Sequence, residues 1–391
     1  MRCFSALPLC AGLLLAAAGS AMGQELRGAV DDQPPIDWSV ALGAQVVHDS
    51  GGTHIEATLA PEVSFGGGGR VSSAKVGLGG KLALETDGTA FVDDIHANGE
   101  TSLRPDAFTS LTGSLDLAVT QLRPGDSSLP VNTAIGPLEF TGDAKGTAKR
   151  NFGRFDLTAT VEAKRFIEGP TTLDDLSTVD NSENSYWLGG ASLRAGFEVT
   201  PALSVFAEGG AEYQAFDAPS TSLAVFLDSR TATLRGGVSM QMDSVLTGEA
   251  SVGYGWIDYA DGSLVDRPAW IADASLTFTP DPSLEIEGAL NTTLGPSDTV
   301  AGDTDVDLTA SLSSTYQVNP WLDLRGSANG SRTLTEGTGD VGYGYGFGAG
   351  VDLRTSRHAV WSGDYSYGHS FAPPGPATDT HTVSVGLKIT N

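Results

Sequence analysis

The sequence contains almost no cysteine, and its two cysteines, Cys3 and Cys10, both lie in an apolar N-terminal segment. We expect that segment to be removed on export, which would leave the mature chain without cysteine. Disulfide bonds and cysteine-ligated zinc therefore cannot stabilise the mature fold. Backbone pairing and side-chain packing must do so alone.

Basic residues are also scarce, because 22 lysines and arginines stand against 48 aspartates and glutamates, for a formal net charge of −26. Nucleic-acid binding needs concentrated lysine and arginine to neutralise phosphates. We therefore expect no nucleic acid among the partners of this chain.

Long hydrophobic runs are absent after the N-terminal segment, so the sequence has no candidate transmembrane helix of about 20 residues. The segment itself has a positive start at Arg2, an apolar core over 4–18 and a small-residue cleavage site that ends at Gly23. That is the pattern of a signal peptide, which implies export.

Three regions follow from this pattern. We predict a signal peptide over 1–23, a flexible periplasmic lead-in over 24–36 and a single β-barrel domain over 37–391. The lead-in contains Pro34 and Pro35, which prevent regular structure there.

Glycine, in contrast, is abundant, and five glycines occupy every second position from 342 to 350. A nucleotide-binding loop of the G-x-G-x-x-G type needs glycines at both even and odd offsets, so this stretch does not qualify. The residues between the glycines, among them Tyr343, Tyr345 and Phe347, are aromatic or apolar. This strict period of two predicts a long strand with one bare face. The glycines either leave space in a lumen, admit an inserted loop, or relieve curvature in a coiled strand.

The same alternation of apolar and polar residues recurs along most of the chain, for example over 187–199, 203–213, 232–242 and 306–312. These predicted strands run for about 10 to 14 residues, which is longer than most soluble strands and long enough to cross hydrocarbon at a tilt.

The connections between the predicted strands alternate in length. Short turns are predicted at 200–201, 242–244, 279–282, 319–320 and 355–357, and longer polar loops at 168–185, 217–229, 260–268, 295–304, 335–340 and 372–380. This layout predicts an all-β fold, a transmembrane antiparallel up-and-down β-barrel of about 16–18 strands.

The stretch 85–150 leaves the strand number open between 16 and 18. Residues 91–97 make a poor strand, and 122–137 either enter the barrel as a loop or lie outside it.

Aromatic residues gather toward the ends of the predicted strands, where lipid headgroups would meet the wall. The set is Trp38, Tyr186, Trp187, Tyr213, Tyr254, Trp256, Tyr316, Trp321, Trp361 and Tyr365. We interpret them as the two girdles of a barrel, although aromatic residues also favour ordinary strands.

A group of charged residues shares the inward register of these strands. The predicted lumen-lining set is Arg194, Glu198, Glu208, Glu212, Arg235, Glu249, Asp273, Glu285, Glu287, Asp307, Asp323, Arg325, Asp352 and Arg354. Acids outnumber bases, which favours cations in a pore. The alternative is an ion-paired network that stiffens the wall and plugs the lumen.

We expect no catalytic residues, no cofactor and no metal site. His48 and His54 flank a turn beside Asp49, but two imidazoles and one carboxylate in an exposed loop rarely form a specific site. No linear catalytic motif occurs, although neighbouring strands could still assemble a Ser–His–Asp site at the outer rim.

Several stretches resemble one protein family. They are SYWLGGASLRAGFEVTPALSVFAEGGAEY, DSRTATLRGGVSMQM, LTGEASVGYGWIDYAD and ASLTFTPDPSLEIEGAL, within about 150–334. They are similar to the putative β-barrel porin-2 family of Gram-negative outer-membrane proteins. The resemblance implies an outer-membrane barrel of about this size and assigns no functional residues. The chain ends in Asn391 and not in the aromatic residue that many such barrels carry.

The predicted function is a porin-like channel for passive diffusion of small polar solutes, with a weak preference for cations. A non-conducting structural or polysaccharide-associated barrel is the alternative, and a lipid-modifying enzyme is a third interpretation. The expected partners are outer-membrane lipid, lipopolysaccharide, the assembly machinery and small polar solutes, and a homo-oligomer is compatible with the sequence.

Overall fold

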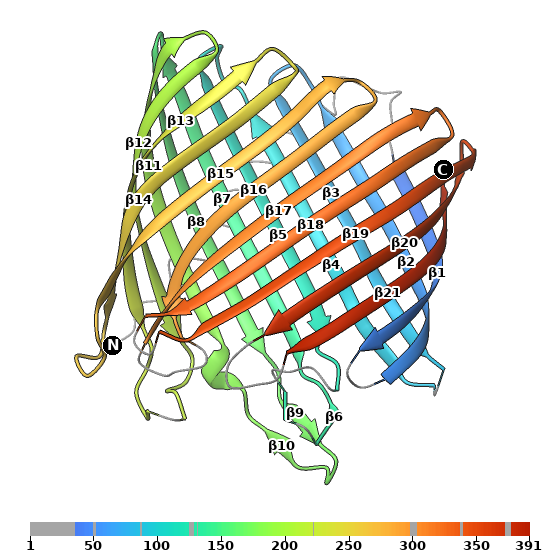
Figure 1. Ribbon diagram of the computed structural model, residues 1–391. Coiled ribbons are helices and arrows are strands. Elements are labelled where there is room, and N and C mark those ends of the chain that lie inside the picture. Colours follow the sequence, from blue (N-terminus) through green and yellow to red (C-terminus); the bar gives the residue numbers. More distant parts are fainter. Residues whose placement is uncertain are drawn as a thin grey trace.

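The protein is a β-barrel, shown in Figure 1 as a computed structural model that describes residues 36–49, 52–86, 88–124, 129–130, 132–221, 223–297, 303–336, 339–371 and 377–391. The predicted signal peptide and most of the lead-in lie outside these residues. Eighteen strands form one antiparallel sheet. They are β1 (Ile36–Asp49), β2 (Gly52–Gly68), β3 (Ser72–Glu85), β4 (Ala90–Leu103), β5 (Thr109–Gln121), β7 (Leu138–Phe152), β8 (Phe155–Glu168), β11 (Tyr186–Thr200), β12 (Leu203–Phe216), β13 (Ser229–Met242), β14 (Leu246–Tyr259), β15 (Arg267–Asp281), β16 (Leu284–Pro296), β17 (Thr304–Asn319), β18 (Leu322–Thr335), β19 (Val341–Ser356), β20 (Ala359–Phe371) and β21 (Thr378–Thr390).

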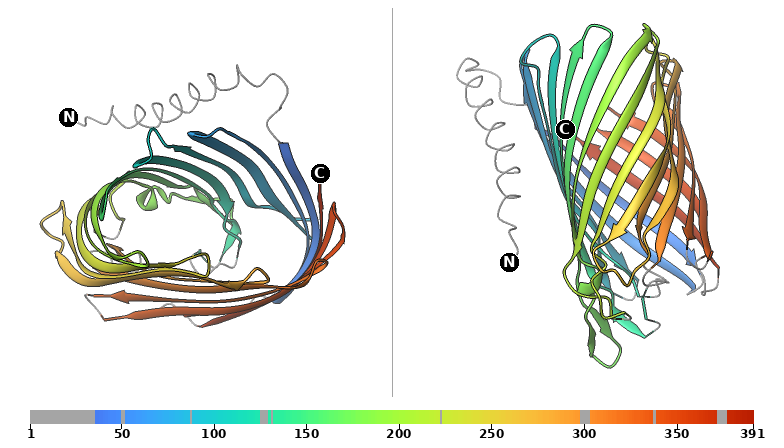
Figure 2. Two further views of the ribbon diagram at one scale, coloured as in Figure 1. Left: turned by 90° about the horizontal axis from the view of Figure 1, so that it is seen from above. Right: turned by 90° about the vertical axis from the view of Figure 1, so that its left-hand side faces the viewer.

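The first and last strands close the sheet into a ring, as Figure 2 shows in its view from above. β1 pairs with β21 from Ser39 opposite Thr390 to His48 opposite His381. In hydrocarbon, an unpaired backbone N–H or C=O has no water to bond to, so a spanning sheet must have no free edge. Closure of β1 onto β21 satisfies that requirement and settles the strand number at 18.

The outer surface of the ring is apolar, which is the reverse of a soluble protein. Large hydrophobic side chains such as Leu234, Val252 and Phe347 are 58%, 60% and 55% exposed. They occupy every second position, so the polar residues between them point inward. Such a continuous exposed apolar surface fits lipid as its solvent. Among the described residues, no helix is long and apolar enough to cross a membrane.

The two rims differ as the sequence predicts. Short connections, such as those at 201–202, 282–283 and 357–358, lie at one rim, uppermost in Figure 1. The longer loops lie at the other rim, which faces outward in barrels of this kind. The start of β1 and the end of β21 lie at the rim of short turns.

The stretch that left the strand number open forms regular wall. Residues 91–97 belong to β4, so the prediction of a poor strand there is wrong. A bulge explains the irregular pattern, because the register with β3 shifts between Lys81 and Leu82. An extra residue at such a bulge breaks the period of two on which the prediction depends.

Between β5 and β7, the described residues of the segment 122–137 lie outside the barrel sheet. Its short strand β6 (Thr133–Ile135) pairs with β9 (Thr171–Leu173), which pairs with β10 (Thr178–Val179), and a 3-10 turn, η1 (Ser182–Asn184), follows. This small sheet projects beyond the loop rim (Figure 1). In the β9–β10 turn, the Ser177 hydroxyl and N–H donate to Asp175, and these bonds lower the pKa of that carboxyl.

Most of the expected girdle residues are exposed near the strand ends. Trp38, Tyr316, Trp321 and Trp361 lie toward the turn rim, and Trp187, Tyr213 and Trp256 toward the loop rim. Tyr186 is an exception, because its ring packs against Phe166 and Phe216. Its register places it on the inner face, opposite to that of Trp187.

A charged substitution should reduce stability more on the outer face of the wall than on the inner face. We expect Leu312→Arg, on the outer face of β17, to lower the free energy of unfolding by about 2–4 kcal/mol, because it places a cation in hydrocarbon. Ser313→Arg, its inward neighbour, should cost less than about 1 kcal/mol. Urea titration of the protein refolded into lipid vesicles measures both. Equal losses would contradict the assignment of the faces.

Candidate functional site

The candidate site is the inner face of the wall. All fourteen residues of the predicted lumen-lining set lie in the register opposite to the exposed apolar side chains. Their interactions show which of the two interpretations, pore or ion-paired network, each part of the wall supports.

One arginine reaches past two strands to a third. Arg194 of β11 donates to both carboxylate oxygens of Glu249 on β14, at 2.6 and 2.7 Å. On the way its guanidinium lies 3.5 Å from the centre of the Phe206 ring. A side chain at Gly237 would collide with that ring, so the glycine lets Phe206 lie flat against the wall. The Arg194–Glu249 ion pair therefore lies flat against the inner wall.

The other predicted arginines are also paired. Arg235 bonds Asp273 and lies 4.0 Å from Glu208. Arg325 lies 2.9 Å from Asp352 and 2.8 Å from Asp364. Arg354 bonds Asp323 on β18. These bridges tie nearby strands together, as the network interpretation predicts.

Five of the predicted carboxylates have no ion pair among the described residues. They are Glu198, Glu212, Glu285, Glu287 and Asp307. Asp307 accepts a hydrogen bond from the Thr333 hydroxyl at 2.5 Å. Because all four predicted arginines are already paired, these acids add unpaired negative charge at several places on the inner wall.

The glycine face of β19 has a more local explanation than those the sequence suggested. The opposite side chains of β18 lean over it. A Cβ at Gly344 would lie 2.9 Å from the Ser331 hydroxyl, and one at Gly346 would lie 2.7 Å from the Asn329 side chain. The glycines therefore make room for polar neighbours to lie flat.

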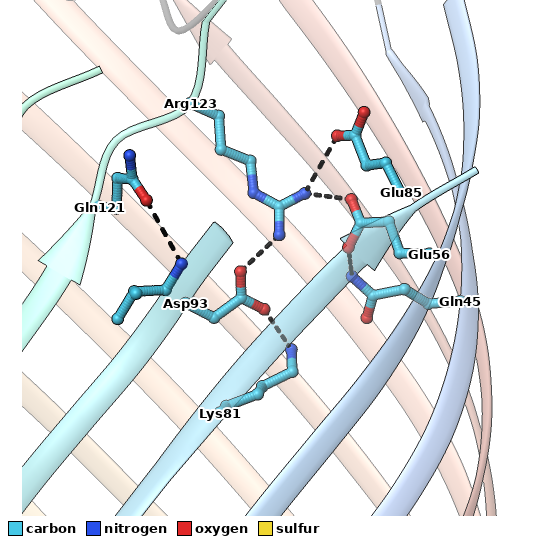
Figure 3. Close-up of polar contacts among 8 residues, drawn as sticks. Gln45, Glu56, Lys81, Glu85, Asp93, Gln121 and Arg123 are labelled. Atoms are coloured by element: carbon cyan, nitrogen blue, oxygen red, sulfur yellow. Dashed lines mark hydrogen bonds and ion pairs between the residues drawn. The ribbon is translucent and has the colours of Figure 1, made fainter. Parts of the chain in front are cut away.

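A second charged cluster lies outside the predicted set (Figure 3). Arg123, just after β5, bonds Glu56 of β2 and Asp93 of β4, and lies 4.0 Å from Glu85 of β3. Glu56 is only 1% exposed. The cluster anchors the start of the 122–137 segment to three strands. In the described part of that segment, Arg123 bonds to the inner wall and β6 belongs to the small sheet beyond the rim.

Further contacts complete the cluster. Gln45 donates to Glu56 at 2.7 Å, Lys81 lies 3.0 Å from Asp93, and Arg123 lies 5.1 Å from the Phe91 ring centre. The sequence analysis missed this cluster because its residues belong to several strands and a loop. The bulge in β4 also hides the inward direction of Asp93.

All six lysines of the chain lie on the inward register. Lys75 and Lys145 line a cavity of about 670 Å³ with Glu100 and a set of small polar side chains, including Ser102 and Ser114. Hydroxyl groups and opposite charges there can bond polar solutes from several sides.

The histidines do not assemble the sites considered from sequence. His48 lies on the outer register and His54 on the inner one, so they cannot share a metal across their turn. Among the described residues, no group of three or more histidine, cysteine or acidic side chains could hold a metal. At the loop rim, the Asp379 carboxylate accepts hydrogen bonds from His369 at 2.9 Å and from the Tyr367 hydroxyl at 2.7 Å. Among the described residues, no serine hydroxyl bonds to these three side chains, so they do not form a Ser–His–Asp site.

The family profile described as "Putative beta-barrel porin 2" matches residues 52–391. No curated protein matches the sequence. Among solved structures, OpdL of Pseudomonas aeruginosa is 13% identical with a TM-score of 0.43, covering 91% of this chain and 98% of that one. OmpT of Vibrio cholerae lacking loop L8 is 14% identical with a TM-score of 0.35, covering 92% and 100%.

The Arg123 cluster predicts a large effect on stability. Arg123→Ala would leave Glu56 buried without its partner, and we expect a loss of about 3 kcal/mol in the free energy of unfolding. Adding Glu56→Gln should recover part of it. Lys388→Ala, which breaks an exposed pair with Glu62, should cost less than about 1 kcal/mol. Urea titration in vesicles compares them, and equal losses would contradict the anchoring role.

Proposed function

We propose that this chain, which belongs to the putative beta-barrel porin 2 family of outer-membrane barrels, is a channel for passive diffusion of small polar solutes with a weak preference for cations. The observation that carries the proposal is the polar inner wall, on which Glu198, Glu212, Glu285 and Glu287 lack ion pairs among the described residues. Unpaired carboxylates attract cations along a water-filled path.

The geometry of the bridges supports an aqueous path. Arg194 and Arg325 lie along the wall, over Phe206 and beside Gly350, and do not extend across the lumen. A ring of 18 strands is also wide enough for an aqueous channel. The network and the pore are therefore compatible, because the bridges stiffen the wall and leave its centre to solvent.

Conductance tests the proposal. In planar bilayers we expect stepwise currents and a reversal potential that favours cations under a salt gradient. Glu285→Gln with Glu287→Gln should lower the cation-to-anion permeability ratio about twofold, because two charges leave the inner wall.

The control is Asp174→Asn, which removes an exposed carboxylate from the turn between β9 and β10 and should leave the permeability ratio unchanged. Folded protein that gives no current would reject the channel and favour the non-conducting barrel. Current with an unchanged ratio in the double variant would reject the assigned source of selectivity.

A further inference from the structure

Three of the six histidines lie together on the lipid-facing side of the wall. His369 of β20, His381 of β21 and His48 of β1 occupy the outer register, within three residues of the strand ends at the loop rim. The three strands are neighbours in the ring, and His381 lies directly opposite His48. The loop rim is the level at which the wall of such a barrel meets lipid headgroups.

Two of these rings are held through their Nδ1 atoms by hydroxyl groups. The Nδ1 of His48 lies 2.8 Å from the Thr53 hydroxyl, and the Nδ1 of His381 lies 3.0 Å from the Tyr365 hydroxyl. A hydroxyl is able to donate to Nδ1, and this leaves the ring proton on Nε2. No described residue bonds to either Nε2 atom, so each ring presents an N–H donor without a partner in the described protein.

The third histidine is fixed between aromatic rings and an acid. His369 stacks on Tyr343 and Tyr345, with ring centres 5.9 and 4.9 Å apart. Its Nδ1 donates to Asp379 at 2.9 Å, and the Tyr367 hydroxyl donates to the same carboxylate at 2.7 Å. Among the described residues, Asp379 is the only acid on the outer register of strands β18 to β21 and β1. These two bonds offset its charge.

An arginine lies on the far side of the stacked rings. Arg332 of β18 is opposite Tyr343 on the outer register, is exposed, and has no ion pair among the described residues. The outer register of these five strands thus carries one arginine and three histidines against a single acid, in a chain whose net charge is −26. We call His48, His369, His381 and Arg332 the histidine patch.

The position and the donors of the histidine patch together favour one class of ligand. On the lipid-facing surface an N–H group without a partner is costly, and the acceptors at this level belong to lipid headgroups. Phosphate oxygens form strong charge-assisted hydrogen bonds with arginine and imidazole donors. The ring centres of His48 and His381 are 6.4 Å apart, so their Nε2 atoms can donate to oxygens of one phosphate.

We propose that the histidine patch binds the phosphate groups of a lipid in the outer leaflet. His48 and His381 donate to one phosphate, and Arg332, about 14 Å from His381 across three strand spacings, donates to another. His369 is a positioning residue, because it holds Asp379 away from the phosphate donors. The site lies on the lipid side of the wall and does not depend on conduction through the lumen.

Lipid retention tests the proposal. The full barrel in detergent is mixed with lipid A, which carries phosphate on its sugar headgroup, or with the same lipid after phosphatase treatment. Native mass spectrometry then measures the bound fraction. We expect the native barrel to retain lipid A about tenfold more than the dephosphorylated lipid, because the donors lose their charged acceptor. Equal retention of the two lipids would overturn the proposal.

Variants of the donors separate the histidine patch from other bound lipid. His48→Phe with His381→Phe keeps two aromatic rings and removes both donors, so retention of lipid A should fall about tenfold. Arg332→Gln changes one exposed side chain and should lower retention about threefold. His358→Phe is the matched control, because His358 is also bonded through Nδ1 but lies at the turn rim, and it should leave retention unchanged.

Two results from these variants would overturn the proposal. The first is unchanged retention of lipid A in both the double variant and Arg332→Gln. The second concerns a second copy of this chain as the occupant. A dimer in the native spectra that the double variant dissociates, with equal lipid A retention before and after, would assign the histidine patch to an interface between copies.

Discussion

The structure depends on one constraint, that backbone hydrogen-bonding groups within hydrocarbon must find partners in the protein. The ring from β1 to β21 meets most of that constraint by strand pairing, and the Thr292 hydroxyl takes the place of the ladder where β15 and β16 separate. The ring also assigns each residue to lipid or to the interior by its position in the register. The absence of cysteine from the barrel fits this dependence, because a closed ladder already links every strand to two others.

Glycine has a particular role in this wall. Gly237 has no side chain to collide with the Phe206 ring, and Gly350 likewise leaves room for the Arg325 guanidinium against the wall. Long polar side chains can then reach carboxylates on other strands while remaining close to the wall. The abundance of glycine and the inner charge pattern are thus two aspects of one arrangement, in which charged residues brace the ring without filling it.

Much of this could be predicted from the sequence, because alternation with a period of two is a local property. The strands around Tyr343 and Leu193, the short turns, the long loops and the inward register of Arg194 follow from it. Contacts between distant strands do not. The partnership of Arg123 with Glu56 needs the closed ring, and the bulge near Asp93 disrupts the local pattern that would have indicated it.

The confinement of lysine to the inner register has a chemical consequence. The outer surface of the described barrel offers no lysine amine, so the ε-amino groups of Lys75, Lys145 and their counterparts are reached only through the interior or its mouths. Acylating reagents of graded size would therefore report the width of the bore, because a lysine within it is modified only by a reagent small enough to enter.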